Sequence, residues 1–458
     1  MQATDPERNS PLPGIASAQA HRALPLADAQ TLVLPAGSPK RHTPAQPAES
    51  GSTQPSPRSH TLLQRIAPRC RPITACTLFL CLACLATAEE PFSPTHQQAA
   101  EAIAARGGAV LASVDAHGKP QVAVRWTAGD EGLQLLARLD RLDWLSLERS
   151  DITDNGLAAL KPLAHLRRLY LSQTRITDAS LAHLAPLRSL EGLWLVDTRI
   201  TDAGLQHLSV LGNLRFLNLA WTDTTSAGLQ HVSRLSQLEG LWLFDTRVDD
   251  SGLAHLAGLR RLQSLKLSWT GVSDAGLAHL AGLSELTHLW LESTAVGDGG
   301  LTQLAKLSKL EVLVLRQTDI TDAGLEPLAA AGRLRHLDLG NTRISDAGLI
   351  HLSRLNQLQW LALDGTRVRG PGLAHLPAER LDYLNLAGTD CDSTSLAPLV
   401  RLQALEGLQL AETKIDDEAV PLLLMLPRLR ELYLRRTRIS AAGLEQLARQ
   451  LPAVEIVR

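Results

Sequence analysis

The stretch that decides the fold runs from Leu190 to Asn213 and reads LEGLWLVDTRITDAGLQHLSVLGN. The same phrase returns every 24 residues along most of the chain. One residue is lost after the tenth copy, and the leucine that opens each of the 13 copies stands at Leu142, Leu166, Leu190, Leu214, Leu238, Leu262, Leu286, Leu310, Leu334, Leu358, Leu381, Leu405 and Leu429. A fixed period of this length predicts that each copy is one structural unit.

Within one copy, the pattern predicts a short strand, a turn, a short helix and a second turn. Leu193 and Leu195 alternate with other residues, as on the inward face of a strand. The Thr198 hydroxyl can bond backbone groups of the turn that follows. Asp202 suits a helix N-cap, because its carboxylate can accept from the free N–H groups of the first helical turn. Three leucines then follow at helical spacing.

Stacking of these units predicts a leucine-rich repeat solenoid. One copy buries too little apolar surface to offset the ordering of its backbone, so neighbouring copies must stabilise each other. Strands stack about 4.8 Å apart, whereas helices need about 8–10 Å. The helical side is therefore wider. We expect an α/β horseshoe of about 13 repeats, with a parallel sheet on the concave face and short helices on the convex face.

The N-terminal 88 residues carry signals of export. Residues 1–61 are rich in Pro, Ser and Ala, which predicts either a disordered extension or a start codon placed too far upstream. Residues 62–88 combine arginines, an uncharged run and Ala86-Thr87-Ala88, as in a secretory signal peptide. We expect a periplasmic, cell-surface or secreted protein. If the extension is genuine, residues 72–88 could instead remain as a membrane anchor.

Cysteine usage fits the same interpretation. Cys391 alone would remain after cleavage, because the other four lie in the leader at Cys70, Cys76, Cys81 and Cys84. An intramolecular disulfide is then impossible, and Cys391 is expected to be buried and inert where other repeats have isoleucine. A lipid-bearing Cys84 is an alternative, although Cys81 stands where such motifs have leucine.

Residues 95–141 predict a cap in front of the repeats. A helical run from Thr95 to Arg106 is followed by two strand-like segments, 109–114 and 121–126. We expect a helix and a hairpin that cover the first open strand. The repeat domain, 142–458, would end in a truncated strand from Val454 to Val457.

The TxITDxGL repeats and the preceding GGxV…GKPxVxV segment resemble exported bacterial leucine-rich repeat proteins with ribonuclease-inhibitor-like repeats. The resemblance covers about Thr95 to Arg458. It implies the horseshoe fold and a binding scaffold, and it names no ligand.

Composition and motifs argue against several functions. The net charge of −2 gives no general attraction to nucleic acid or anionic lipid. The sequence has no phosphate-binding glycine loop and no HExxH, so we expect no enzyme, no cofactor and no metal. A column of histidines on the predicted convex face is interpreted as repeat inheritance, because metal ligation needs converging ligands; its members are His183, His207, His231, His255, His279, His351 and His375.

The best candidate site is aromatic. Positions three, five, seven and eight of the repeats, all outward on the predicted strand side, hold most of the Trp, Tyr and Phe residues. Gly192 and Gly240 would leave space for an indole to lie flat, or for a ligand. Large aromatic side chains dominate protein interfaces. The predicted ligand-binding residues are Tyr170, Trp194, Phe216, Trp221, Trp242, Phe244, Trp269, Trp290 and Trp360.

Position ten forms a second column, which is basic in seven repeats: Arg175, Arg199, Arg247, Arg343, Arg367, Lys414 and Arg438. Asp223, Asp319 and Asp390 interrupt it, and Asp197 and Asp245 lie two residues before an arginine. We expect a solvated edge whose charges compensate each other. The irregular repeat at 358–380 contains Gly370-Pro371-Gly372, which predicts a local kink.

These observations predict an exported recognition scaffold that binds a protein partner through the aromatic concave face. Two alternatives stay open. The same tryptophans could stack on the sugars of a carbohydrate or cell-wall ligand, or the aromatics could pack only on each other in a structural surface spacer. The sequence names neither the partner nor the oligomeric state.

Overall fold

The computed structural model describes residues 93–114 and 120–458. The predicted extension, signal segment and alternative membrane anchor therefore lie outside the described residues. No helix of the described part has the length and apolar character needed to cross a membrane.

Sixteen strands of the described residues form one open sheet in which the spatial order equals the chain order. β1 (Ala109–Val114) runs antiparallel to β2 (Pro120–Arg125), and every later pair is parallel. The repeat strands are β3 (Trp144–Ser146), β4 (Arg168–Tyr170), β5 (Gly192–Trp194), β6 (Phe216–Asn218), β7 (Gly240–Trp242), β8 (Ser264–Lys266), β9 (His288–Trp290), β10 (Val312–Val314), β11 (His336–Asp338), β12 (Trp360–Ala362), β13 (Tyr383–Asn385), β14 (Gly407–Gln409) and β15 (Glu431–Tyr433), followed by β16 (Glu455–Val457).

Short helices follow the strands on the other side of each repeat. The α-helices are α2 (Pro94–Ala104), α3 (Asp154–Leu157), α4 (Asp178–Leu181), α5 (Asp202–Leu205), α6 (Leu229–Val232), α7 (Asp250–Leu256), α8 (Asp274–Leu277), α9 (Asp298–Leu304), α10 (Asp322–Leu328), α11 (Val420–Leu423) and α12 (Ala441–Gln450). The 3-10 helices are η2 (Leu133–Arg138), η3 (Ala158–Leu160), η4 (Ala182–Leu184), η5 (Gln206–Val210), η6 (Ser226–Gly228), η7 (Ala278–Leu280), η8 (Gly348–Arg354), η9 (Pro371–His375), η10 (Thr394–Arg401) and η11 (Asp417–Ala419).

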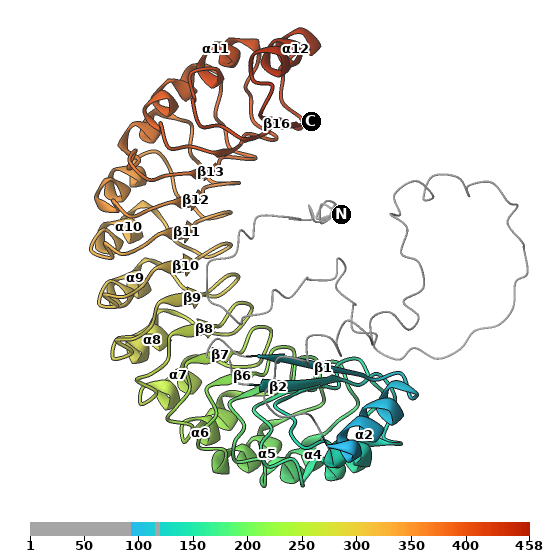
Figure 1. Ribbon diagram of the computed structural model, residues 1–458. Coiled ribbons are helices and arrows are strands. Elements are labelled where there is room, and N and C mark those ends of the chain that lie inside the picture. The colour runs from blue at the N-terminus through green and yellow to red at the C-terminus, as the bar shows by residue number, and fades with distance from the viewer. Residues whose placement is uncertain (1–92, 115–119) are drawn as a thin grey trace, which may run out of the picture. The chain divides into compact units, whose positions relative to one another are not determined.

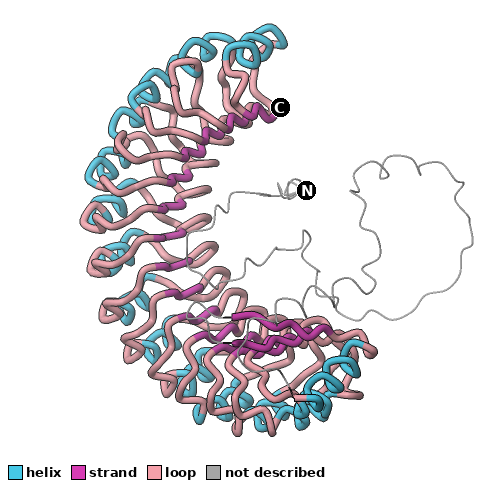
Figure 2. Tube along the Cα trace, in the orientation of Figure 1, coloured by secondary structure: helices cyan, strands magenta, loops and turns pink. Residues whose placement is uncertain are grey.

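The repeats curve with their strands on the inner side and their helices on the outer side (Figures 1 and 2). This arrangement is the predicted leucine-rich repeat horseshoe. It follows from the spacing argument, since stacked strands lie closer together than stacked helices.

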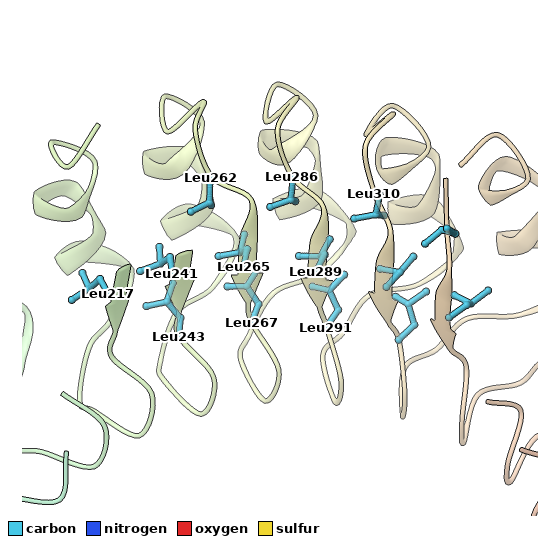
Figure 3. Close-up of a cluster of buried hydrophobic side chains, with 14 of the residues drawn as sticks. Leu217, Leu241, Leu243, Leu262, Leu265, Leu267, Leu286, Leu289, Leu291 and Leu310 are labelled. Carbon is cyan, nitrogen blue, oxygen red and sulfur yellow. The ribbon is translucent and has the colours of Figure 1, made fainter. Parts of the chain in front are cut away.

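Columns of leucine fill the space between the two sides. Leu217, Leu241, Leu265 and Leu289 come from four successive strands and are all fully buried (Figure 3). Each is paired in register with the leucine one repeat away. Each of these leucines in the interior of the array therefore packs between equivalent leucines of the two neighbouring repeats, which makes the core continuous along the array.

The threonine turn forms as predicted. The Thr198 hydroxyl donates to the carbonyl oxygen of Leu195 at 2.6 Å. The same bond recurs in the other repeats, from Thr174 to Thr437, and Ser150 makes it in the first. A buried polar side chain is thereby satisfied within its own turn.

The predicted role of Asp202 is wrong. Thr201 is the N-cap of α5, and its hydroxyl accepts from the N–H of Ala203 at 3.3 Å. The Asp202 carboxylate instead accepts from the N–H and the hydroxyl of Thr225, at 2.8 and 2.5 Å, in the next repeat. The aspartate column therefore links repeats to each other.

The glycine that most repeats have two residues after the aspartate position belongs to the same linkage. A Cβ placed on Gly228 would overlap Oδ1 of Asp202. The same overlap recurs at Gly204 with Asp178 and at Gly276 with Asp250. In the phrase Thr-Asp-x-Gly, the threonine therefore binds the preceding aspartate and the glycine makes room for it.

The ends of the array continue these rules. Asp130 accepts from the N–H and hydroxyl of Thr153 at 2.8 and 2.5 Å, so the linkage begins before the first full repeat. Fully buried Ile103 of α2 packs in the same core as Trp126.

In the irregular repeat, η9 replaces the usual α-helix while β12 and β13 stay paired, so the lost residue is absorbed on the convex side. Cys391 is a buried free cysteine, and burial raises the pKa of its thiol.

Candidate binding surface on the concave face

Position eight of every repeat has a left-handed backbone. The φ values include +54° at Trp221, +52° at Asp245 and +56° at Trp269, and only Gly365 and Gly388 in this column are glycines. The left-handed region disfavours side chains, by roughly 1 kcal/mol for an ordinary residue. Two bulky tryptophans therefore stand where the repeat geometry is least tolerant of them.

The first predicted aromatic residues form two close pairs on the concave face. Tyr170 and Trp194 stack with ring centroids 4.2 Å apart, and Phe216 lies 6.3 Å from Trp242. Tyr170 is only 8% exposed, so it supports the Trp194 indole more than it presents a surface of its own.

The two glycines under these tryptophans are filled by indole. A Cβ on Gly192 would lie 2.5 Å from the Trp194 ring, and one on Gly240 would lie 2.8 Å from the Trp242 ring. Each indole therefore lies flat over the glycine two residues before it. The space above each glycine was expected to hold either an indole or a ligand. The indole fills it, so no space above the glycine is left for a ligand.

Trp221, Phe244 and Trp269 form a second aromatic group at the ends of neighbouring strands. The Phe244 centroid is 5.0 Å from the Trp221 ring and 6.4 Å from the Trp269 ring, and both contacts are edge-on. Trp269 is 43% exposed. This group therefore presents more open aromatic surface than the pairs above.

Trp290 and Trp360 have different neighbours. The Lys266 ammonium lies 4.5 Å from the Trp290 ring centroid, and His288 stacks on the same indole at 5.8 Å. Trp360 lies between His336 and Tyr383 in a stack, at 3.8 and 5.3 Å. Valines and charged residues of the intervening repeats separate Trp360 from the other predicted residues, so the structure does not bring it into their group.

Sequence reasoning missed a charged network between these aromatics. The Arg316 guanidinium makes two bonds to Asp364, at 2.6 and 2.7 Å, and one to Asp338 at 3.1 Å. It passes over Gly340, where a Cβ would overlap it. The arginine thereby reaches across two repeats. Charged residues at positions five and seven, where neighbouring repeats have small or apolar ones, were the available signal.

Burial shifts the pKa values of this region in the direction expected for charges taken partly out of water. Burial raises the pKa of the Asp338 carboxyl, and the positive charge of Arg316 opposes the shift. Burial also raises the pKa of Glu292 and lowers the pKa of Lys266. Within the described residues, the Glu292 carboxylate has no hydrogen bond and no ion pair.

The charges of the position-ten edge compensate each other only in part. Arg247 pairs with Asp223 at 3.1 Å, Arg343 with Asp319 at 2.7 Å, and Lys414 with Asp390 at 2.6 Å. These pairs confirm the expected compensation. The expectation was wrong for Asp197 and Asp245, because no ion pair joins either carboxylate to the arginine two residues later.

The opposite edge of the face holds a polar groove of about 660 Å³ near the N-terminal end of the array. Its lining includes Arg167, Glu191 and Arg215. Arg167 pairs with Glu191 at 3.3 Å, and Arg215 with Glu239 at 2.7 Å. These four charges are therefore already paired with each other.

The comparisons with known proteins agree with this architecture. The family model described as Leucine Rich repeat matches residues 306–329 and 334–353. The chain is similar to the crystal structure of an internalin from Listeria monocytogenes, with a TM-score of 0.56 and 23% identity over 72% of this chain and 93% of that one. It is also similar to a leucine-rich repeat protein from Leptospira interrogans, with a TM-score of 0.54 and 18% identity over 71% of this chain and 80% of that one. The comparison with curated protein sequences gave no match.

The fold of the described residues is therefore that of a leucine-rich repeat solenoid. Such solenoids are generally non-catalytic scaffolds, and their extended concave surfaces commonly serve protein–protein recognition.

Proposed function

We propose that this chain is an exported, non-catalytic recognition scaffold that holds a protein partner on its aromatic concave face. The observation that supports this most is the continuity of the aromatic surface. Six successive repeats each contribute at least one of the residues Tyr170, Trp194, Phe216, Trp221, Trp242, Phe244, Trp269 and Trp290. Six stacked strands span about 24 Å, a length on the scale of a protein interface.

Ring orientation favours a protein over a carbohydrate. A sugar stacks on an open ring face, but Tyr170 covers one face of Trp194 and Lys266 covers one face of Trp290. The surface also alternates aromatic rings with charged groups such as Glu292 and Arg316. A protein partner can match both kinds of group at once, with aromatic anchors inside a polar surround.

Export is supported by the basic and apolar segments and by Ala86-Thr87-Ala88, all of which lie outside the described residues. Mass spectrometry of the mature N-terminus, after expression in a secreting host, tests this part. A chain that begins at Glu89 is the expected result. An intact chain starting at Met1 and retained in the cytoplasm would contradict export.

Binding is tested by affinity capture with the full chain as bait. The test variant replaces Trp194, Trp242 and Trp290 by Ser, and the matched control replaces His207, His255 and His279 by Ser on the convex side. A partner that the native chain and the control retain, and that the test variant loses, is the expected result. Equal retention by all three chains would show that the concave aromatics are not the binding surface.

A further inference from the structure

Trp221, Asp245 and Trp269 occupy position eight in three successive repeats. Their φ values are +54°, +52° and +56°, so the three side chains leave equivalent points of the backbone. Successive repeats are about 4.8 Å apart on the strand side. Asp245 therefore belongs to the repeat between the two that carry the tryptophans.

Phe244 closes the space between the two indoles. It directly precedes Asp245, and its ring is in edge-on contact with Trp221 at 5.0 Å and with Trp269 at 6.4 Å. Because both indoles contact the one Phe244 ring, a single cationic group placed against that ring can approach both indoles within the roughly 6 Å limit of a cation–π contact. The spacing therefore suits a single cationic group.

Asp245 differs from the other acidic residues of its column because no side chain of the described residues binds its carboxylate. Glu412 pairs with Arg436 at 2.7 Å, and Asp197 accepts from the Gln173 amide at 3.3 Å. The nearby Arg247 is bound to Asp223 in the preceding repeat. In the described part of the chain, no side chain pairs with the exposed Asp245 carboxylate.

Glu292 is the backbone neighbour of Trp269 in the next repeat, because the Trp269 backbone N–H donates to the Glu292 backbone carbonyl oxygen at 2.8 Å. The two cations of this region are engaged elsewhere. Lys266 lies over Trp290, and Arg316 is bound to Asp338 and Asp364.

From this arrangement we propose that Trp221, Phe244 and Trp269 form an aromatic cage for one cationic side chain, arginine or lysine, of a protein partner, with Asp245 as its counter-ion. The choice of a protein side chain as occupant rests on the proposed function.

The test uses the full chain labelled with 5-fluorotryptophan, so that each indole reports its own surroundings in a fluorine NMR spectrum. The resonances are assigned by single Trp→Phe variants. The probe is the peptide acetyl-Gly-Arg-Gly-amide, and its neutral control carries citrulline in place of arginine. We expect the arginine peptide to shift the Trp221 and Trp269 resonances saturably while Trp126 and Trp290 stay unchanged. The citrulline peptide should bind at least about tenfold more weakly, because it lacks both the cation–π and the charge contribution.

Two variants and two matched controls locate the effect. Trp269→Leu keeps apolar bulk but removes the aromatic face, and Asp245→Asn removes the counter-ion; each should weaken the arginine peptide about two- to fivefold. Glu412→Gln changes an acid at the same backbone position, and Trp360→Leu changes an indole outside both the cage and the proposed recognition face; neither should alter binding of the peptide. Equal shifts with arginine and citrulline, or equal losses in Asp245→Asn and Glu412→Gln, would overturn the cage.

The titration separates this inference from the proposed function, because it needs no partner protein. If the peptide fails to bind while the triple Trp→Ser variant still loses the captured partner, the cage is wrong and the recognition face stands. If the peptide binds as expected while that variant retains the partner, the cage stands and the wider aromatic face is wrong.

Discussion

At the residue scale, the linkage between repeats depends on the small size of glycine. Gly228 has an ordinary helical backbone, so its role is spatial and not conformational. The Asp202 carboxylate occupies the volume that a side chain would need. By contrast, nothing lies within 4 Å of a Cβ placed on Gly212, in the same stretch of the chain.

Gly228→Ala is therefore expected to destabilise the protein by about 1–3 kcal/mol, through overpacking and a disturbed pair of hydrogen bonds. Gly212→Ala is the matched control and should be neutral or slightly stabilising. The measurement is the midpoint of urea unfolding followed by circular dichroism. In an Asp202→Ala background the cost of Gly228→Ala should shrink, and an undiminished cost would contradict the linkage.

A second prediction at this scale concerns strain. Trp269→Asn places a residue that tolerates the left-handed backbone at φ +56°, so thermal stability should be unchanged or rise, by up to about 1 kcal/mol. Trp194→Asn is the comparison, because that indole stacks on Tyr170 and lies over Gly192, and its loss should lower the melting temperature. A lower melting temperature in Trp269→Asn than in Trp194→Asn would contradict the assignment of strain.

At the scale of the element, the link between repeats tolerates an exchange of partners. Most links pair an aspartate with a hydroxyl residue of the next repeat. In the link between Ser226 and Asp249 the order is reversed, with the hydroxyl in the earlier repeat and the carboxylate in the later one. The Ser226 hydroxyl donates to Asp249 at 2.6 Å, and the Asp249 N–H donates back to Ser226 at 2.9 Å. Ser393 and Asp416 repeat the exchange. The link therefore needs one carboxylate and one hydroxyl, in either order.

This exchange predicts a compensating pair of substitutions. Ser226→Asp alone sets two carboxylates against each other and should lower the unfolding midpoint at pH 7. Adding Asp249→Ser restores the order found in other repeats and should recover most of the loss. The matched measurement is urea unfolding of the two variants beside the native chain. A double variant that is no more stable than Ser226→Asp would contradict the interchangeable link.

The same pair predicts a dependence on pH. Hydrogen bonds from Ser226, and then from Ser251, hold the pKa of Asp249 below its usual value of 3.8. The folded state thus binds fewer protons than the unfolded state near this pH. The stabilisation is present above pH 3.8 and is lost as pH falls through the lowered pKa. In Ser226→Ala, the free energy of unfolding should therefore fall less between pH 5 and pH 3 than it does in the native chain, as measured by urea unfolding. An equal fall in both chains would contradict the contribution of this hydrogen bond.

At the scale of the whole array, each repeat is stabilised by the two beside it. Leu241 is fully buried between Leu217 and Leu265, whereas β16 pairs with β15 alone, and its residues are half-buried or exposed. Interior repeats therefore have two stabilising interfaces and the last strand has one.

Amide hydrogen exchange should accordingly be slowest in β7 to β9 and fastest in β16. Leu241→Ala should cost about 2–5 kcal/mol and should speed exchange in β6, β7 and β8 together, because the cavity weakens both of its interfaces. Val210→Ala, at a side chain that is 44% exposed, is the control and should change neither quantity. Equal exchange rates in all strands would contradict the inference that each repeat is stabilised by the two repeats beside it.

The sequence by itself determined what each residue does inside its own repeat. Strand alternation placed the leucines inward and the aromatic rows outward, and the turn position of Thr198 determined its bond to Leu195, because these relations involve only a few neighbouring residues. The tertiary structure alone decided which repeat a side chain reaches. Asp202 binds Thr225, Arg316 passes over Gly340 to Asp364, and in the described part of the chain no side chain pairs with the Asp245 carboxylate. Such contacts depend on the distance and rotation between stacked repeats. The packing of all repeats together sets this geometry, and the sequence of a single repeat does not specify it.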